Sequence, residues 1–289
     1  MQIIDGKKIS EAIQTELNAV VQKLNTHGII PHIVIIQVGD NPASNVYIRN
    51  KLKLCEKINV HGELRKFPES VTQQELIAAI NTLNHDAAVN GILVQLPVPR
   101  HINEDAIIAA IDADKDVDCF HLINVGALWT SKKKYDGILP CTPAGIIAML
   151  KYDHIPIAQK NVVIIGRSNI VGKPLAALFL LEDATVTICH SKTVDLPKIC
   201  QRADILVSAI GKANFITQQY TNPQQVVIDV GMNRDANGKL CGDVDFNAVK
   251  DHVAYITPVP GGVGPMTITM LLKNLINVTI KQQKNNFML

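Results

Sequence analysis

Apolar residues along the chain fall into two kinds of segment, short β-branched runs and longer stretches with helical spacing. In the first half, the runs at residues 33–38 and 91–96 are short and apolar, as buried strands are. A helix is expected before the second run, opened by a capping box in Ser70-Val71-Thr72-Gln73. Alternation of this kind predicts an α/β fold with parallel sheets flanked by helices.

The second half of the chain repeats this pattern. Further apolar runs that suit strands buried on both faces occur at residues 161–165, 184–189, 204–210 and 226–230. The boundary between the halves is expected within residues 131–140, where charged and turn residues precede a helix opened by Thr142-Pro143. A closing helix is expected from about residue 266 to 281, and its apolar stripe predicts that it packs back onto the first half.

Composition and charge narrow the class of protein. The 289 residues are 47% hydrophobic with a net charge of +2, which favours a globular protein and argues against a nucleic-acid partner. The six cysteines form no C-x-x-C pair, which predicts reduced thiols in a cytoplasmic protein and no metal site. The longest apolar run, at residues 175–181, is too short to span a membrane, and the N-terminus has no apolar signal core. A soluble, unsecreted protein is expected.

A tyrosine and a lysine stand four residues apart directly after the first strand. Asn41 is a good N-cap and Pro42 a good first helical residue, so Tyr47 and Lys51 should share one face near the start of a helix. An aromatic ring beside a proton donor suits a flat heterocyclic substrate. The same spacing also fits an ordinary amphipathic rim, with the lysine reaching water.

A glycine-bounded turn, Gly166-Arg167-Ser168-Asn169-Ile170-Val171-Gly172, links an expected strand to an expected helix. Such a turn aims backbone N–H groups and a helix N-terminus at a phosphate. Its two glycines flank five residues and do not form G-x-G-x-x-G, so a simple tight turn is an alternative interpretation.

The end of the following strand indicates which dinucleotide would bind. NAD sites usually place a carboxylate there to hold the ribose hydroxyls, whereas this strand ends in His190-Ser191-Lys192-Thr193. Side chains that could contact a ribose phosphate are instead available from Arg167, Ser168, Ser191 and Lys192. The sequence therefore predicts NADP rather than NAD, with Arg167 as the charged partner.

Motifs in a fixed order show a resemblance to a known family. In sequence order they are Tyr47-x-x-x-Lys51, Gly91-Ile92-Leu93-Val94-Gln95-Leu96-Pro97, Lys115-Asp116-Val117-Asp118, the Gly166–Gly172 turn and Pro258-Val259-Pro260-Gly261-Gly262-Val263-Gly264-Pro265-Met266-Thr267. Over nearly its whole length the chain resembles the bifunctional methylenetetrahydrofolate dehydrogenase/cyclohydrolases.

The resemblance implies an architecture and an activity. A catalytic folate-binding domain would comprise residues 1–138 plus 266–289, and a Rossmann-like NADP domain would comprise residues 139–265, with a cleft between them and a homodimer as the assembly. NADP would oxidise 5,10-methylenetetrahydrofolate to the methenyl compound. Hydrolysis would then give 10-formyltetrahydrofolate, in one-carbon metabolism and purine biosynthesis.

Within this family, roles can be assigned to the residues of the folate site. Tyr47 would be the stacking platform for the pterin, and Asp118 would accept hydrogen bonds from it. Lys51 would move protons in the hydrolysis, and lowering a lysine pKa from about 10.4 to about 8 needs roughly 3 kcal/mol of differential interaction. Gln95 would hold Lys51 or the water. Considered alone, Asp118 and Gln95 also fit as solvated surface residues.

Other contacts are expected from strand ends and glycine turns. The substrate would also meet Val94, Leu96, Pro260, Gly261, Gly262, Val263 and Gly264, although a rigid connector would use the last turn equally well. The cofactor would meet Gly166, Arg167, Ser168, His190, Ser191 and Met232.

The chain departs from the family pattern beside Asp118. Cys119 stands where glycine is usual, and Leu122 where proline is common. A side chain at positive φ costs roughly 1 to 2 kcal/mol, so either the loop is not left-handed or the site is rearranged. Cys119 is either a reactive thiol or a small apolar filler.

Two other functions remain open on the sequence alone. An NADP dehydrogenase of a small hydroxy or amino acid would explain the nucleotide turn, but it gives no role to Tyr47 or Gln95. A dinucleotide-sensing binding protein would leave Lys51 and Gln95 without a function.

Overall fold

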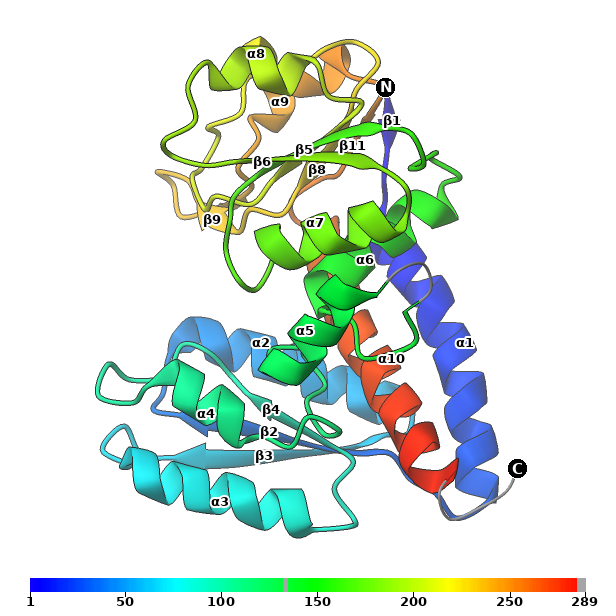
Figure 1. The fold of residues 1–289 in the computed structure, drawn as a ribbon, viewed down its shortest axis with the longest axis vertical. Coiled ribbons are helices and arrows are strands. Elements are labelled where there is room, and N and C mark those ends of the chain that lie inside the picture. Colours follow the sequence, from blue (N-terminus) through cyan, green and yellow to red (C-terminus); the bar gives the residue numbers. More distant parts are fainter. Residues whose placement is uncertain (132–134, 285–289) are drawn as a thin grey trace. The chain divides into compact units, whose positions relative to one another are not determined.

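The computed structural model describes residues 1–131 and 135–284 and divides into two compact units (Figure 1). We call one the three-stranded unit; it comprises Ala12–Ala127, Asp136–Leu139 and Ile268–Leu289. The six-stranded unit comprises Met1–Glu11, Leu128–Tyr135 and Pro140–Thr267. The boundary expected at residues 131–140 includes residues 132–134, which lie outside the described part of the chain.

The sheet of the three-stranded unit is parallel throughout. Its order is β3 (His61–Phe67), β2 (His32–Val38) and β4 (Gly91–Val94). The strand expected at residues 33–38 is confirmed, whereas the one expected at 91–96 ends two residues early and leaves Gln95 just beyond the sheet. The edge strand β3 was not expected, because its charged sequence lacks an apolar run.

Helices cover both faces of this sheet. A buried apolar cluster joins β2 and β4 to α3 (Gln73–His85) and α4 (Glu104–Ala110). On the other face, α10 (Val263–Lys284) comes so close that a Cβ on Gly91 would lie 2.8 Å from Leu275 Cδ1. This contact confirms that the closing helix packs back onto the first half.

The closing helix is a core element. Among the described residues, it alone is long and apolar enough to cross a membrane, over Val263–Gln283. However, 61% of its most apolar stretch is buried, as in a helix at the centre of a folded domain. The helix begins at Val263, three residues before the expected start at 266.

The sheet of the six-stranded unit is also parallel. Its order is β1 (Gln2–Ile3), β11 (Tyr255–Ile256), β8 (Val226–Asp229), β7 (Ile205–Ser208), β5 (Asn161–Ile165) and β6 (Thr185–Cys189). The expected strands of the second half are confirmed, although the one expected at 204–210 ends two residues early, and the predicted α/β fold is confirmed with them. The sequence grouped the first residues with the first half, whereas Gln2 pairs with Tyr255 in this sheet.

The connections of this sheet create a switch point. From β5 the chain passes to β6 on one side and then crosses to β7 on the other. Helices α8 (Leu196–Gln201) and α9 (Phe246–Val249) lie on one face, and α6 (Cys141–Tyr152) and α7 (Gly172–Leu181) on the other (Figure 1). Ligands of such open sheets bind outside the carboxyl ends of the strands at the switch point, here β5 and β7.

The remaining elements connect these layers. They are α1 (Gly6–Thr26), α2 (Pro42–Lys57), α5 (Leu122–Thr130), the 3₁₀ turns Gln218–Tyr220 and Lys250–His252, and the antiparallel pair β9 (Asn233–Arg234) and β10 (Leu240–Cys241). The antiparallel pair was not expected.

Two helix starts test the capping predictions. Asn41 caps α2 as expected, because its Oδ1 accepts a hydrogen bond from Ser44 N at 3.2 Å. The capping box of α3 is present but shifted: Thr72 and Glu75 form it, so the assignment to Ser70 and Gln73 was wrong. Gln73 instead accepts a bond from Asn103 N, 2.9 Å away.

Thr72→Ala should lower the free energy of unfolding by about 1 kcal/mol, because the N–H of Glu75 loses its acceptor. Thr82→Ala, in the exposed interior of the same helix, is the matched control and should change stability by less than about 0.5 kcal/mol. Urea unfolding followed by circular dichroism measures both. Equal losses in the two variants would contradict the capping role.

Candidate active site

Lys51 and Gln95 meet at the carboxyl end of the three-stranded sheet. Lys51, on α2, is only 8% exposed, and its Nζ donates a hydrogen bond to Gln95 Oε1 at 3.0 Å. A charged ammonium needs such partners when it is removed from water. The structure thus brings together two residues that the sequence separates by more than forty positions.

The amide of Gln95 is fixed in one orientation. Its backbone N–H bonds Ile36 O, and its side-chain Nε2 donates to Leu96 O, both at 2.9 Å. Because a lysine ammonium can only donate, Oε1 must face Lys51. The result is a buried proton donor held in a defined direction beside the strand end.

Tyr47 lies one helical turn before Lys51 and is half-buried. Burial raises the pKa of its phenol above the usual value, so the side chain stays neutral at physiological pH. The two apolar candidates beside Gln95 are positioned differently from Tyr47. Val94 is buried in the cluster shared with α3 and α4, and Leu96 packs against that cluster, so Val94 offers a ligand its backbone rather than its side chain.

The turn that contains Asp118 is organised by a residue to which the sequence assigned no role. Asp116 is 3% exposed, and its Oδ1 accepts a hydrogen bond from Asp118 N at 3.3 Å. Its Oδ2 accepts from His121 N and Asn124 Nδ2, both at 2.9 Å. An aspartate followed two residues later by another is the signal that could have indicated such a turn. Asp116 thereby fixes the backbone from which Asp118 projects.

Cys119 adopts a left-handed conformation, with φ of 62°. The alternative that this loop is not left-handed is therefore wrong, and the side chain carries the cost of about 1 to 2 kcal/mol that a glycine would avoid. Burial, followed by the nearby carboxylates of Asp116 and Asp118, raises the pKa of the Cys119 thiol. A protonated, 2% exposed thiol fits the apolar filler rather than a nucleophile.

In the six-stranded unit, the turn after β5 is shaped by two close approaches. Gly166 has a φ of 128°, and a Cβ there would overlap Ala209 O. A Cβ on Gly172 would overlap Gly166 O. Ser168 Oγ accepts hydrogen bonds from Val171 N at 3.1 Å and Gly172 N at 3.3 Å, which closes the turn just before α7. The compact turn before a helix N-terminus fits a dinucleotide pyrophosphate.

The side chains expected to meet the ribose phosphate gather at two neighbouring strand ends. Ile165 pairs with Cys189, so the residues that follow them begin side by side. Arg167, Ser168, Ser191 and Lys192 are exposed there, and no carboxylate occurs between Cys189 and Thr193. His190 stabilises the second turn, because its Nδ1 accepts a hydrogen bond from Lys192 N at 3.1 Å. A positive, hydroxyl-rich edge fits the additional phosphate of NADP.

The turn at residues 260–264 is held within the same unit. Gly261 has a φ of 105°, and its carbonyl accepts a hydrogen bond from Lys7 N at 3.0 Å. A Cβ on Gly262 would lie 2.5 Å from Pro258 O. These contacts account for the glycines as a tight connector, and a folate contact by Pro260, Gly261, Gly262, Val263 and Gly264 stays a prediction. Met232, 49% exposed, follows the end of β8.

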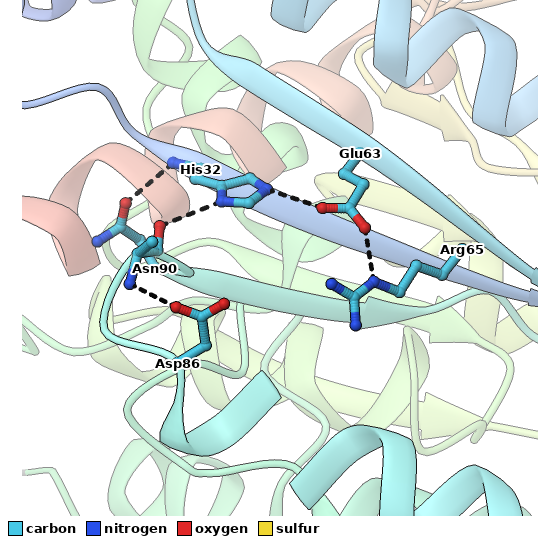
Figure 2. A network of polar contacts seen from close by, with 6 residues as sticks. His32, Glu63, Arg65, Asp86 and Asn90 are labelled. Carbon is cyan, nitrogen blue, oxygen red and sulfur yellow. Dashed lines mark hydrogen bonds and ion pairs between the residues drawn. The ribbon is translucent and has the colours of Figure 1, made fainter. Parts of the chain in front are cut away.

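Another titratable cluster lies at the amino end of the three-stranded sheet (Figure 2). His32 Nδ1 lies 3.1 Å from Ala88 O, and its Nε2 lies 3.4 Å from Glu63 Oε2. The other oxygen of Glu63, Oε1, pairs with Arg65. Burial, and then the stacked ring of His61, lower the pKa of His32. Within residues 1–131 and 135–284, no group of His, Cys, Asp or Glu could hold a metal ion.

Sequence and structure comparisons show similarity to one family throughout the chain. Residues 4–118 match the catalytic domain of tetrahydrofolate dehydrogenase/cyclohydrolase, and residues 140–283 match its NAD(P)-binding domain. The bifunctional protein FolD of Listeria innocua is 52% identical over 285 residues, which cover 99% of both chains.

Solved structures show the same similarity. The FolD methylenetetrahydrofolate dehydrogenase/cyclohydrolase of Campylobacter jejuni has a TM-score of 0.94 and 47% identity, and the match covers 99% of this chain and 100% of that one. The Trypanosoma brucei FolD, complexed with NADP and an inhibitor, has a TM-score of 0.92 and 37% identity, with coverages of 96% and 97%. The resemblance inferred from the sequence is thus confirmed, and the chain belongs to the tetrahydrofolate dehydrogenase/cyclohydrolase family.

Proposed function

We propose that this chain oxidises 5,10-methylenetetrahydrofolate with NADP and then hydrolyses the methenyl product to 10-formyltetrahydrofolate. Family membership over both domains supports this function, as does the relative that is complexed with NADP. The observation that carries the proposal is the hydrogen bond between buried Lys51 and Gln95 in the domain that matches the family's catalytic domain. The reaction of a small hydroxy acid dehydrogenase would give no role to Lys51 and Gln95.

In the oxidation, the protein mainly positions its ligands. The nicotinamide of NADP supplies the chemistry by accepting a hydride from the folate methylene carbon. We assign Tyr47 to stack on the pterin and Asp118 to accept hydrogen bonds from its amino group and ring N–H. The turn at residues 260–264, with the backbone of Val94 and the side chain of Leu96, completes the folate contacts.

We assign the cofactor to the carboxyl edge of β5 and β6. The backbone at Gly166 would receive the pyrophosphate, and Arg167, Ser168 and Ser191 would bind the ribose phosphate. His190 shapes the turn that presents Ser191, and Met232, at the end of β8, would contact the nicotinamide half.

In the hydrolysis, water adds to the electron-poor methenyl carbon and loses a proton. The hydroxyl left on that carbon loses its proton as the bond from the carbon to N5 breaks and N5 takes up a proton, so that the formyl group remains on N10 and one proton is released overall. One group that gives and receives protons serves both steps, and we assign this role to Lys51. Gln95, held at three atoms, keeps the ammonium aimed in one direction.

We assign folate binding and NADP binding to different domains. We assign folate binding to the domain of residues 1–138 plus 266–289 and NADP binding to residues 139–265, with the correction that β1 completes the NADP sheet. We further propose a cytoplasmic homodimer that supplies purine biosynthesis, as the resemblance inferred from the sequence implies. Sedimentation at micromolar concentration would test the dimer.

The direct test mixes the protein with 5,10-methylenetetrahydrofolate and NADP. Absorbance of the methenyl compound should rise and then fall as the formyl product forms. Replacing NADP by NAD should slow the rise, because Arg167 loses its phosphate partner. If the methenyl compound never appears, or if NAD serves equally well, the corresponding assignment is wrong.

Lys51→Met should reduce hydrolysis of the methenyl compound by about 100-fold or more, because the proton-transferring group is gone. NADP affinity and the circular dichroism spectrum should stay those of the wild type. Lys53→Met, an exposed lysine on the same helix, is the matched control and should hydrolyse normally. Normal hydrolysis by the Lys51 variant would remove this residue from the mechanism.

Asp118→Ala should raise the folate dissociation constant by about 10-fold or more, since hydrogen bonds to a charged acceptor are lost. Asp114→Ala removes an exposed carboxylate from the same segment and should leave folate binding unchanged. Titration calorimetry with the folate measures both variants. A wild-type constant for the Asp118 variant would contradict its role.

A further inference from the structure

The loop after β7 lies against the dinucleotide turn. Ala209 N donates a hydrogen bond to Ile165 O at 2.8 Å, and Ala209 O occupies the place that a Cβ on Gly166 would fill. The two segments leave β5 and β7, the strands on either side of the switch point. The path of residues 208–212 therefore shapes the crevice in which a dinucleotide is expected to bind.

A buried carboxylate holds this loop. Asp243 is fully buried, and its Oδ2 accepts hydrogen bonds from Ser208 Oγ at 3.1 Å and Ile210 N at 2.8 Å. Its Oδ1 accepts from Lys212 N and Asn233 Nδ2, both at 2.9 Å. One side chain thus fixes the loop after β7 and, through Asn233, the segment after β8.

Asp243 is in turn fixed by a second buried carboxylate. Asp229 is 3% exposed; its Oδ1 accepts hydrogen bonds from Gly231 N and Asp243 N, and its Oδ2 from Val244 N, all at 2.9 Å. Burial raises the pKa of Asp229 to about 6, although these three N–H groups oppose the shift. The surrounding chain leaves no space: a Cβ on Gly231 would overlap Asp243, and one on Gly242 would overlap Asp229.

Burial of two carboxylates carries a large desolvation free energy, because each group loses its hydration. Apolar side chains of similar volume would fill the same space at lower cost. The carboxylates fix the conformation of the loops, because Asp243 accepts hydrogen bonds from two loops that meet at one sheet edge. Their placement at the switch point indicates a purpose beyond packing.

We propose that Asp243 is a positioning residue for the NADP site, which holds residues 208–212 and 231–233 in the form that binds the nicotinamide half of the cofactor. The phosphate-binding side chains lie at the ends of β5 and β6, so the loops after β7 and β8 are left for that half. Asp243 does not touch the cofactor and acts through Ile210, Lys212 and Asn233. The inference rests on the proposed function.

Asp243→Asn tests the proposal, because it replaces one acceptor oxygen by an amide that faces N–H donors. We expect the NADP dissociation constant, measured by titration calorimetry, and the KM for NADP to rise by about 10-fold or more. Hydrolysis of the methenyl compound uses no NADP and should keep its wild-type rate. The ratio of the two activities of one chain thus separates misplacement of the loops from general loss of structure.

Asp204→Asn is the matched control in the same unit. Its carboxylate accepts a hydrogen bond from Asn161 N at 2.8 Å, at the amino ends of β5 and β7, away from the switch-point crevice. This variant should keep wild-type NADP affinity, even if it melts at a lower temperature. Ser208→Ala is a milder second variant that removes one bond to Asp243, and it should raise the NADP dissociation constant by a smaller factor.

Wild-type NADP affinity in Asp243→Asn would overturn the proposal, as would a parallel loss of both activities in a folded variant. If Asp243→Asn does not fold, Ser208→Ala decides: weaker NADP binding with normal hydrolysis supports the proposal, and unchanged binding refutes it. Absence of NADP-dependent oxidation in the wild type would instead contradict the proposed function.

Discussion

Polar groups buried at the carboxyl ends of parallel strands must find partners inside the protein, and this constraint organises both units. In the three-stranded unit, the side-chain amide of Gln95 donates to Leu96 O and accepts from the ammonium of Lys51, and the backbone N–H of Gln95 donates to Ile36 O. In the six-stranded unit, Asp229 and Asp243 together accept seven hydrogen bonds from the loops around them. Satisfying these groups fixes the geometry of the segments where ligands of such sheets bind.

The buried charged groups of the two units have opposite signs: an ammonium, Lys51, in one, and two carboxylates, Asp229 and Asp243, in the other. A cation buried with a neutral amide keeps a mobile proton close to the strand end, which suits acid–base chemistry. Carboxylates surrounded by backbone N–H groups act as fixed anchors for loops. The distinction agrees with the proposed function, in which one domain would transfer protons and the other would orient a cofactor that supplies its own chemistry.

Much of the fold follows from the sequence because buried parallel strands require uninterrupted apolar runs. The edge strand β3 was not predicted because its charged sequence lacks an apolar run, and β1 was not predicted because it is too short to form a pattern. The helical face shared by Tyr47 and Lys51 was predictable from spacing, and Gln95 from its place after a strand. The pairing of Asp243 with Ser208, Ile210 and Lys212 was not, because it joins residues more than thirty positions apart through tertiary contacts alone.

The pairing of Gln2 with Tyr255 affects how the protein is made. During synthesis the first strand emerges long before its partner and has nothing to bind until residue 255 has left the ribosome. Contacts this distant in sequence form slowly, because a large loop must close before they stabilise anything. The six-stranded sheet therefore cannot be completed by folding progressively from the N-terminus, and β1 is added to it late.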